Sequence, residues 1–195
     1  MATKGEMTRE RLITEAALLI QRKGFTGTSI GDLVAATGVK KGSLYFHFLG
    51  KDELGLAVLE RSRDKFNEFF DEALSGETPA QSLSNFFDAV VALHRRTGFV
   101  GGCIFGNTAL EMSDGDERFT RVVDRFFADM AARLAGVVTA AQQAGQMRTD
   151  LPAGTLAEQI VMSLEGGIML ARLRKDEKPL RLCFDTLKVF LRLDE

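Results

Sequence analysis

A short segment between Thr37 and Lys51 combines residue types that bind nucleic acid. It contains a glycine where a turn is predicted, Gly38, followed by two adjacent lysines and by the chain's single tyrosine, Tyr45. Lysine ammonium groups neutralise phosphates. A tyrosine offers a flat ring to a thymine methyl group and a hydroxyl to a phosphate or a base edge. These groups predict recognition of DNA.

Two short helices are expected to position these groups. The first is predicted to begin near Thr28 or Ser29, with Asp32 completing a capping box if Ser29 is the cap. Glycine tolerates a positive φ at little steric cost, so Gly38 allows a sharp turn before a second helix over about residues 41–48. An apolar wedge would fix the angle between the helices: Ile30, Leu33, Val34, Val39 and Leu44. This pattern is typical of a helix-turn-helix, whose second helix enters the major groove.

The exposed side of the second helix is expected to face the DNA. Gly42 lets the backbone approach closely and leaves amide groups near the helix start for phosphate oxygens. The other residues predicted on this side are Lys40, Lys41, Ser43, Tyr45 and His47.

Charge is distributed unevenly along the 195 residues, whose formal net charge is −2. Residues 1–51 contain eight Lys/Arg and four Asp/Glu, whereas residues 52–195 contain seventeen and twenty-three. A basic head on an acidic body is typical of a DNA-reading module joined to a domain with another task. We therefore predict a DNA-binding domain over residues 1–51 and a larger domain over residues 52–195.

The rest of the chain follows the helical period, and no segment alternates with period two. There are only three prolines, each compatible with a helix start. The expected fold is all-α, with about nine helices. No apolar run reaches the roughly 20 residues that span a bilayer, no signal peptide is expected, and two cysteines are too few for a disulfide framework. These features predict a cytoplasmic protein that does not enter the membrane.

An enzyme is the first alternative, and the sequence offers it little. Two histidines, no metal-ligand pair, no phosphate loop and no dinucleotide fingerprint leave few groups for catalysis. We expect no catalytic residues, no metal and no cofactor.

Residues 37–54, Thr-Gly-Val-Lys-Lys-Gly-Ser-Leu-Tyr-Phe-His-Phe-Leu-Gly-Lys-Asp-Glu-Leu, resemble the helix-turn-helix signature of the TetR family of transcriptional regulators. The likeness extends upstream to Gly24-Phe25 and residues 28–30. Lys40 departs from it, because many relatives carry a Ser or Thr cap there. The resemblance implies operator contacts for Thr28, Lys41, Gly42, Tyr45, His47 and Lys51, to which we add Ser29, Lys40 and Ser43.

The resemblance also implies an effector pocket among the middle helices. An aromatic, apolar pocket suits a small hydrophobic or aromatic molecule. Core packing is the alternative for most of the phenylalanines, and also for His94. The residues predicted for the pocket are Phe66, Phe70, Phe87, His94, Cys103, Asn107, Glu111, Phe126, Phe127 and Met130.

Cys103 follows two glycines, and two interpretations remain open for it. In a similar Gly-Cys context, some TetR-like regulators use a cysteine to sense oxidants or electrophiles. A buried cysteine otherwise acts as a small apolar filler. The sequence does not choose between them.

The last two helices are expected to form a homodimer, as the corresponding pair does in the family. Packing within one chain is the alternative. The predicted interface residues are Ile160, Leu164, Gly167, Ile168, Ala171, Phe184, Leu187, Phe190 and Leu191. The resulting hypothesis is a dimeric repressor that leaves its operator when it binds an effector. A DNA-binding module without an effector is the alternative.

Overall fold

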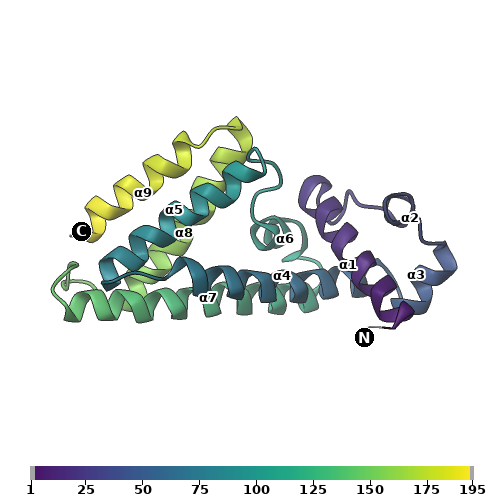
Figure 1. The fold of residues 1–195 in the computed structure, drawn as a ribbon, viewed down its shortest axis with the longest axis horizontal. Coiled ribbons are helices and arrows are strands. Elements are labelled where there is room, and N and C mark those ends of the chain that lie inside the picture. Colours follow the sequence, from purple (N-terminus) through teal and green to yellow (C-terminus); the bar gives the residue numbers. More distant parts are fainter. Residues whose placement is uncertain (1–2, 194–195) are drawn as a thin grey trace. The chain divides into compact units, whose positions relative to one another are not determined.

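The computed structural model describes residues 3–193 and contains nine α-helices and no strand within that range (Figure 1). The helices are α1 (Lys4–Lys23), α2 (Ile30–Thr37), α3 (Lys41–His47), α4 (Lys51–Ala73), α5 (Pro79–Arg96), α6 (Ile104–Met112), α7 (Glu117–Gln143), α8 (Ala153–Arg174) and α9 (Lys178–Leu191). The prediction of an all-α fold with about nine helices is confirmed.

The chain divides into two compact units. Unit 1 consists of residues 1–65 and 104–124, and unit 2 of residues 66–103 and 125–195. Unit 1 thus includes the first part of α4, all of α6 and the start of α7 in addition to the three N-terminal helices. The expected domain boundary at residues 51 and 52 does not coincide with this division.

Local hydrogen bonds fix the helix starts of unit 1. Thr3 caps α1 through a capping box with Glu6, so the helix begins before Thr8, where its start was expected. The Thr8 hydroxyl instead donates to the carbonyl oxygen of Lys4 within the helix. Ser29 caps α2, and its capping box with Asp32 is confirmed. Side-chain hydrogen bonds of Thr3 and Ser29 therefore fix where α1 and α2 begin.

Polar contacts join α1 to α2 in unit 1. The Lys23 ammonium lies 2.6 Å from a carboxylate oxygen of Asp32, and the Arg11 guanidinium donates to the carbonyl oxygen of Thr37. Beneath these contacts the apolar stripe of α1 is buried: Leu12, Ile13, Ala16 and Ile20. Helix α1 also packs against α6.

Aromatic rings form much of the core of unit 2. The ring centroids of Phe66 and Phe70 lie 4.8 Å apart, as do those of Phe66 and Phe126. Phe70 in turn contacts Phe86 at 4.7 Å. Tilted and edge contacts at such distances are favourable arrangements of aromatic pairs. A continuous set of rings therefore links α4, α5 and α7 within this unit.

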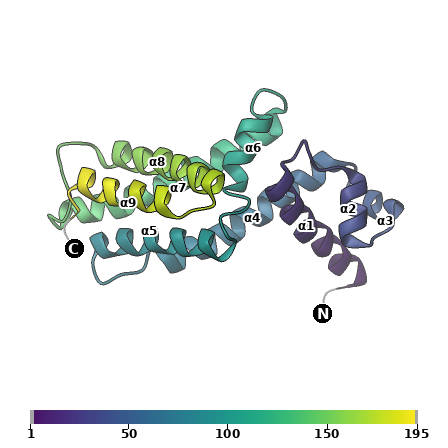
Figure 2. The same cartoon turned by 90° about the horizontal axis from the view of Figure 1, so that it is seen from above.

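Helices α8 and α9 lie side by side in unit 2, and α5 packs against α9 (Figure 2). Gly167 permits the close approach of α8 and α9, because a Cβ atom there would lie 3.0 Å from Leu180 Cδ1 and 3.2 Å from Cys183 Cβ. Between α5 and α9, the rings of Phe87 and Phe184 stack at 4.5 Å with an interplanar angle of 9°.

In the part of the chain that the structure describes, no helix is long and apolar enough to cross a membrane. Over the same residues, no three His, Cys, Asp or Glu side chains are grouped so that they could hold a metal ion.

Candidate DNA-binding surface and effector region

Helix α3 is held in unit 1 by a glycine turn and by buried apolar side chains. Gly38 adopts a left-handed conformation (φ 63°), as its place in the turn requires, and its N–H donates to the carbonyl oxygen of Val34. Leu44 and Phe48 are fully buried. Lys40 occupies the N-cap position of α3 without a side-chain capping bond, as its residue type predicts. The opposite side of α3 is therefore left to the solvent.

The predicted reading face is largely exposed. Lys40, Lys41 and Gly42 are exposed, and nothing lies within 4 Å of a Cβ atom placed on Gly42. Tyr45 is also exposed, and the Lys41 ammonium lies 6.0 Å from the centroid of its ring. The two remaining predicted residues of this helix, Ser43 and His47, are half-buried. The structure thus brings two cations and an aromatic ring together on one accessible face.

Thr28 and Lys51, predicted as operator contacts, have other partners. Thr28 is buried, and its hydroxyl donates to the Gly24 carbonyl oxygen at 2.7 Å, so its side chain supports a turn and does not face solvent. The Lys51 ammonium donates to the Phe25 carbonyl oxygen at 3.1 Å and lies 4.6 Å from the centroid of that ring. Operator contacts of these two residues stay predictions, and the structure shows that both side chains also support the turn after α1.

Ser29 is exposed but acts as the cap of α2. Its hydroxyl accepts from the Asp32 N–H at 3.1 Å and donates to the Asp32 carboxylate at 2.7 Å. Hydrogen bonds from Lys23 and Ser29 hold the pKa of Asp32 well below its usual range. Ser29 therefore fixes the start of α2, the helix that precedes α3.

Sequence reasoning missed Phe46, the residue after Tyr45. Its side chain is 84% exposed, and Leu49, just beyond the helix, is 90% exposed. With Tyr45 they place three large exposed side chains within five residues, and exposed apolar side chains that occur together mark interaction sites. The available signal was the helical period: Phe46 falls between the buried positions Leu44 and Phe48.

The predicted effector residues of unit 2 lie mostly in the aromatic core. Phe70, Phe87, Phe126 and Met130 are buried, whereas Phe66 and Phe127 are half-buried. Phe126 contacts Phe127 as well as Phe66, with ring centroids 5.3 Å apart. For most of these phenylalanines, packing against another ring accounts for the apolar surface that the sequence assigned to a ligand.

Glu111, predicted as an orienting group of the pocket, has a backbone partner in the structure. It lies in α6 of unit 1, where its carboxylate accepts a hydrogen bond from the Thr26 N–H at 2.8 Å. Asn107, also in α6, is half-buried. These two residues belong by their contacts to the unit that carries the reading helix.

Cys103 and His94 lie in unit 2 and are both half-buried. The Cys103 thiol forms a hydrogen bond with the carboxyl of Glu165, a residue that sequence reasoning did not select. Burial raises the pKa of Glu165 to about 7, and the hydrogen bond from Cys103 opposes that rise. Burial also lowers the pKa of His94, so this imidazole is neutral at neutral pH.

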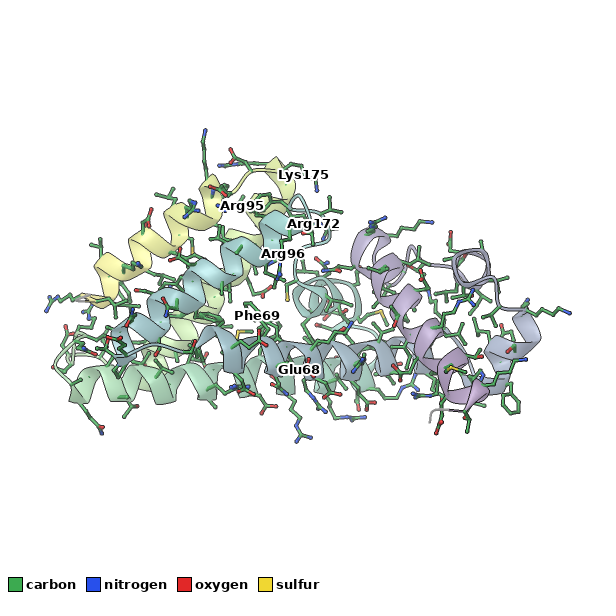
Figure 3. The ribbon with its side chains drawn as sticks, in the orientation of Figure 1. Glu68, Phe69, Arg95, Arg96, Arg172 and Lys175 are labelled. Carbon is green, nitrogen blue, oxygen red and sulfur yellow. The ribbon has the colours of Figure 1, made fainter. Side chains whose placement is uncertain are left out.

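Cations gather at one end of unit 2. Arg95 and Arg96 end α5, and Arg172 and Lys175 lie at the end of α8 (Figure 3). Arg95 pairs with Glu177 at 2.5 Å. A groove of about 430 Å³ reaches the two arginines of α5. It is lined by residues that were not predicted for the pocket: Phe69, Glu72, Ala73, Ala89, Ala92, Arg95 and Arg96. No local motif marks this groove, because its lining combines residues of α4 and α5 that are about 20 positions apart in the sequence.

The predicted dimer residues mark the inner face of α8 and α9. Eight of the nine are buried within the chain, and only Phe190 is exposed. Phe184, for example, stacks on Phe87 of the same chain. The apolar residues that α8 and α9 expose are instead Met162, Met169, Leu173, Leu182, Val189 and Phe190. Between the two helices, a groove of about 500 Å³ is lined in part by Leu170, Leu182, Leu187 and Phe190.

Comparisons with known proteins agree with an N-terminal helix-turn-helix that is followed in the sequence by a helical C-terminal domain. The family model of bacterial regulatory proteins of the TetR family matches residues 12–58, and the model of the tetracyclin repressor-like C-terminal domain matches residues 79–187. A helix-turn-helix transcriptional regulator of Lactococcus lactis is 30% identical over 183 residues, which cover 93% of this chain and 91% of the relative. The chain belongs to the TetR family of DNA-binding transcriptional regulators.

A named repressor and a solved structure extend the likeness over most of the chain. The repressor DhaR of a Mycobacterium species is 26% identical over 88% of this chain and 86% of its own length. The crystal structure of a regulatory protein TetR from Rhodobacter sphaeroides superposes with a TM-score of 0.90 at 27% identity, covering 95% of this chain and 99% of that one. The prediction of a TetR-type regulator is confirmed.

Proposed function

We propose that this regulator is a repressor that binds a two-fold symmetric operator as a homodimer and is released by a small apolar or aromatic effector. The observation that carries the DNA-reading part is the exposed face of α3, where Lys40, Lys41, Tyr45 and Phe46 stand in solvent above a buried anchor. The lysines contact phosphates and set affinity, whereas the rings contact base edges and sugars and set sequence preference.

Repression is supported by DhaR, whose name gives it as a transcriptional repressor. A repressor blocks transcription by occupying DNA, so it needs a surface for DNA and no surface for polymerase. The exposed face of α3 supplies the former.

The dimer is proposed to form through the outer face of α8 and α9. Leu173, Leu182 and Val189 are each more than two-thirds exposed on these helices, and the groove between them offers an apolar depression to a second copy. An exposed apolar patch of this kind marks an interaction surface. A two-fold dimer places two α3 helices on half-sites one helical turn apart, about 34–36 Å, or a multiple of it.

The effector is proposed to act on unit 2, the unit that contains most of the residues matched by the C-terminal family model. A molecule that binds better to the form with lower DNA affinity shifts the population away from the operator, and DNA lowers effector affinity by the same factor. We expect Cys103→Ser to keep the response to this effector. Loss of the response, together with release of the wild type by oxidants, would favour the thiol-sensor interpretation.

The mutual packing of Phe66, Phe70 and Phe126 favours a second candidate, a DNA-binding module without an effector. A screen of small apolar and aromatic molecules for release of bound DNA separates the two. Release with a matching rise in thermal stability supports the sensor, since a ligand that binds the folded state stabilises it.

The experiment that tests DNA reading is selection of duplexes from random sequence by the purified protein at near-physiological salt. We expect a two-fold symmetric consensus bound by a dimer, with affinity that falls as salt rises. Enrichment of no sequence at all would contradict the proposal.

A further inference from the structure

The turn between α1 and α2 sets the direction in which α2, and α3 after it, continue from α1. It is braced internally, because the Thr28 hydroxyl donates to Gly24 at 2.7 Å and the Thr28 N–H donates to Phe25 at 3.2 Å. Helix α2 begins directly after this turn, at Ile30, and α3 follows across Gly38. A change in the turn should therefore move the exposed face of α3.

A carboxylate from far along the chain completes the turn. Glu111 of α6 accepts the Thr26 N–H at 2.8 Å across a sequence separation of 85 residues. Gly24 lies against the same group, since a Cβ atom on Gly24 would stand 2.9 Å from Glu111 Cδ. Gly24 also has φ +83°, a conformation that L side chains rarely adopt. The turn is thus shaped to receive this carboxylate.

Other anchors hold the turn independently of Glu111. The centroids of the Phe25 and Phe119 rings lie 4.8 Å apart, and Gly55 leaves room for both rings, because a Cβ atom there would collide with the Phe25 ring and lie 3.1 Å from Phe119 Cζ. Lys51 donates to the Phe25 carbonyl oxygen. Loss of the Glu111 carboxylate should therefore leave unit 1 folded and free one backbone amide.

We propose that Glu111 is a positioning residue for DNA binding: its carboxylate holds the Thr26 amide and thereby the placement of α2 and α3. This role differs from both the operator contacts and the effector pocket, because Glu111 touches the turn behind the reading helices. It acts through a charge-assisted hydrogen bond, which is stronger than one between neutral groups.

The proposal makes a prediction opposite in sign to that of simple electrostatics. Removal of a carboxylate makes the chain less negative, and this alone strengthens binding to the DNA polyanion. A positioning role predicts weaker binding to a specific site. The direction of the change therefore separates the two effects.

The test compares Glu111→Ala, Glu111→Gln and Glu117→Ala on a duplex selected by the wild type. Glu117 is an exposed glutamate of the same unit, paired only with Arg121 among the described contacts, so it controls for lost charge. We expect Glu111→Ala to bind about fivefold more weakly, as loss of one hydrogen bond to a charged group on the surface implies. Glu111→Gln keeps an acceptor oxygen and should stay within about twofold of the wild type, and Glu117→Ala should bind equally well or slightly better.

Amide exchange at Thr26 is the second readout, since a general loss of stability would not single it out. We expect faster exchange there in Glu111→Ala, with exchange in α9 unchanged. Equal or tighter DNA binding by Glu111→Ala would overturn the proposal, and so would weaker binding with an unchanged Thr26 amide. If Glu111→Ala does not fold, Glu111→Asp keeps the charge on a shorter arm and should weaken binding in the same way.

Discussion

Helix α3 and the α8–α9 pair both place apolar side chains in solvent, but different groups accompany them. Phe46 on α3 stands beside Tyr45 and two lysines, whereas Leu173 and Val189 stand with other apolar residues of the outer face. Aromatic rings among cations suit a polyanion with stacked bases, and a purely apolar face suits a second protein surface. The residues that surround an exposed apolar side chain, and not its exposure alone, indicate whether it binds DNA or another protein.

The two regions also differ in how their apolar stripes relate to function. In α3 the apolar stripe is buried, and the opposite face of the helix was predicted to contact the DNA. In α8 and α9 the strongest stripe was itself predicted as the interface, yet Ile160 and Leu164 are buried in the chain's own core. A helix uses its most apolar side to complete its own fold, so an interface has to be sought on its second face.

The largest expected effect comes from a charge on the outer face of α8 and α9. Leu182→Asp should convert the dimer to a monomer, because a carboxylate cannot be buried unpaired at an interface. Operator affinity should then fall by about 100-fold or more, since the second half-site no longer binds intramolecularly. Sedimentation and DNA titration measure the two effects. Leu110→Asp, which charges an exposed leucine of α6, is the matched control and should remain dimeric.

The next largest expected effect is the pH dependence of the stability of unit 2. This unit contains a carboxyl group whose pKa is raised by burial, whereas the lysines of α3 are exposed. The folded pKa of Glu165 is raised to about 7 from an ordinary value of 4.5, so the folded state holds this proton more tightly than the unfolded state. Its contribution is complete below pH 4.5 and is lost as the pH rises through 7. Glu165→Gln should remove this loss, so the stability of the variant relative to the wild type should rise by about 2–3 kcal/mol between pH 5 and pH 8.

Denaturant unfolding of both proteins between pH 5 and 8 checks this prediction. His94 has a lowered pKa and contributes the opposite slope below about pH 6.5, but it does so in both proteins and cancels in their difference. A constant difference between variant and wild type over that range would show that the Glu165 carboxyl is not buried as described.

The lysines of α3 should affect DNA binding through its salt dependence. Replacement of Lys40 and Lys41 by alanine would remove two predicted phosphate contacts, which should lower the slope of log affinity against log salt by about 2. Affinity at physiological salt should fall about tenfold, equally on selected and unrelated duplexes. The same double replacement at Lys65 and Lys178, two exposed lysines that are not predicted to contact DNA, is the control. An equal change of slope in that control would mean that the effect is one of overall charge.

The smallest expected effect concerns the cap behind the reading helix. Ser29→Ala removes the capping box of α2 and should cost about 1 kcal/mol in the stability of unit 1. Thr8→Ala, within α1, should be neutral, because Thr8 caps no helix and alanine favours the helical state. Amide exchange is the measurement, in α2 for Ser29→Ala and in α1 for Thr8→Ala. Equal effects of the two changes would contradict the helix start at Thr3.

The sequence predicted unit 1 well because its signals are local. The turn at Gly38, the Ser29–Asp32 cap and the anchor Leu44 each depend on residues a few positions apart. The contacts that it missed are distant: Glu111 meets Thr26 across 85 residues. Spacing along one helix carries no information about such pairs.

The functional residues of unit 2 were harder to predict for the same reason. Helical period identified which rings point inward, and the core confirms this for Phe70, Phe87 and Phe126. It did not show that Phe87 would meet Phe184, or that Cys103 would meet Glu165, because tertiary packing decides both. An inward ring serves equally well as core or as pocket wall until its neighbours are known.

The most direct test of the central claim, that α3 reads the operator, is the binding of Tyr45→Ala to a selected duplex and to a scrambled one. Tyr45 is exposed and lies outside the core, so the variant should fold and dimerise normally. We predict a loss of at least about tenfold on the selected duplex, the cost of one base contact, with unchanged binding to the scrambled duplex. Unchanged binding to both duplexes would contradict the placement of the reading face on α3.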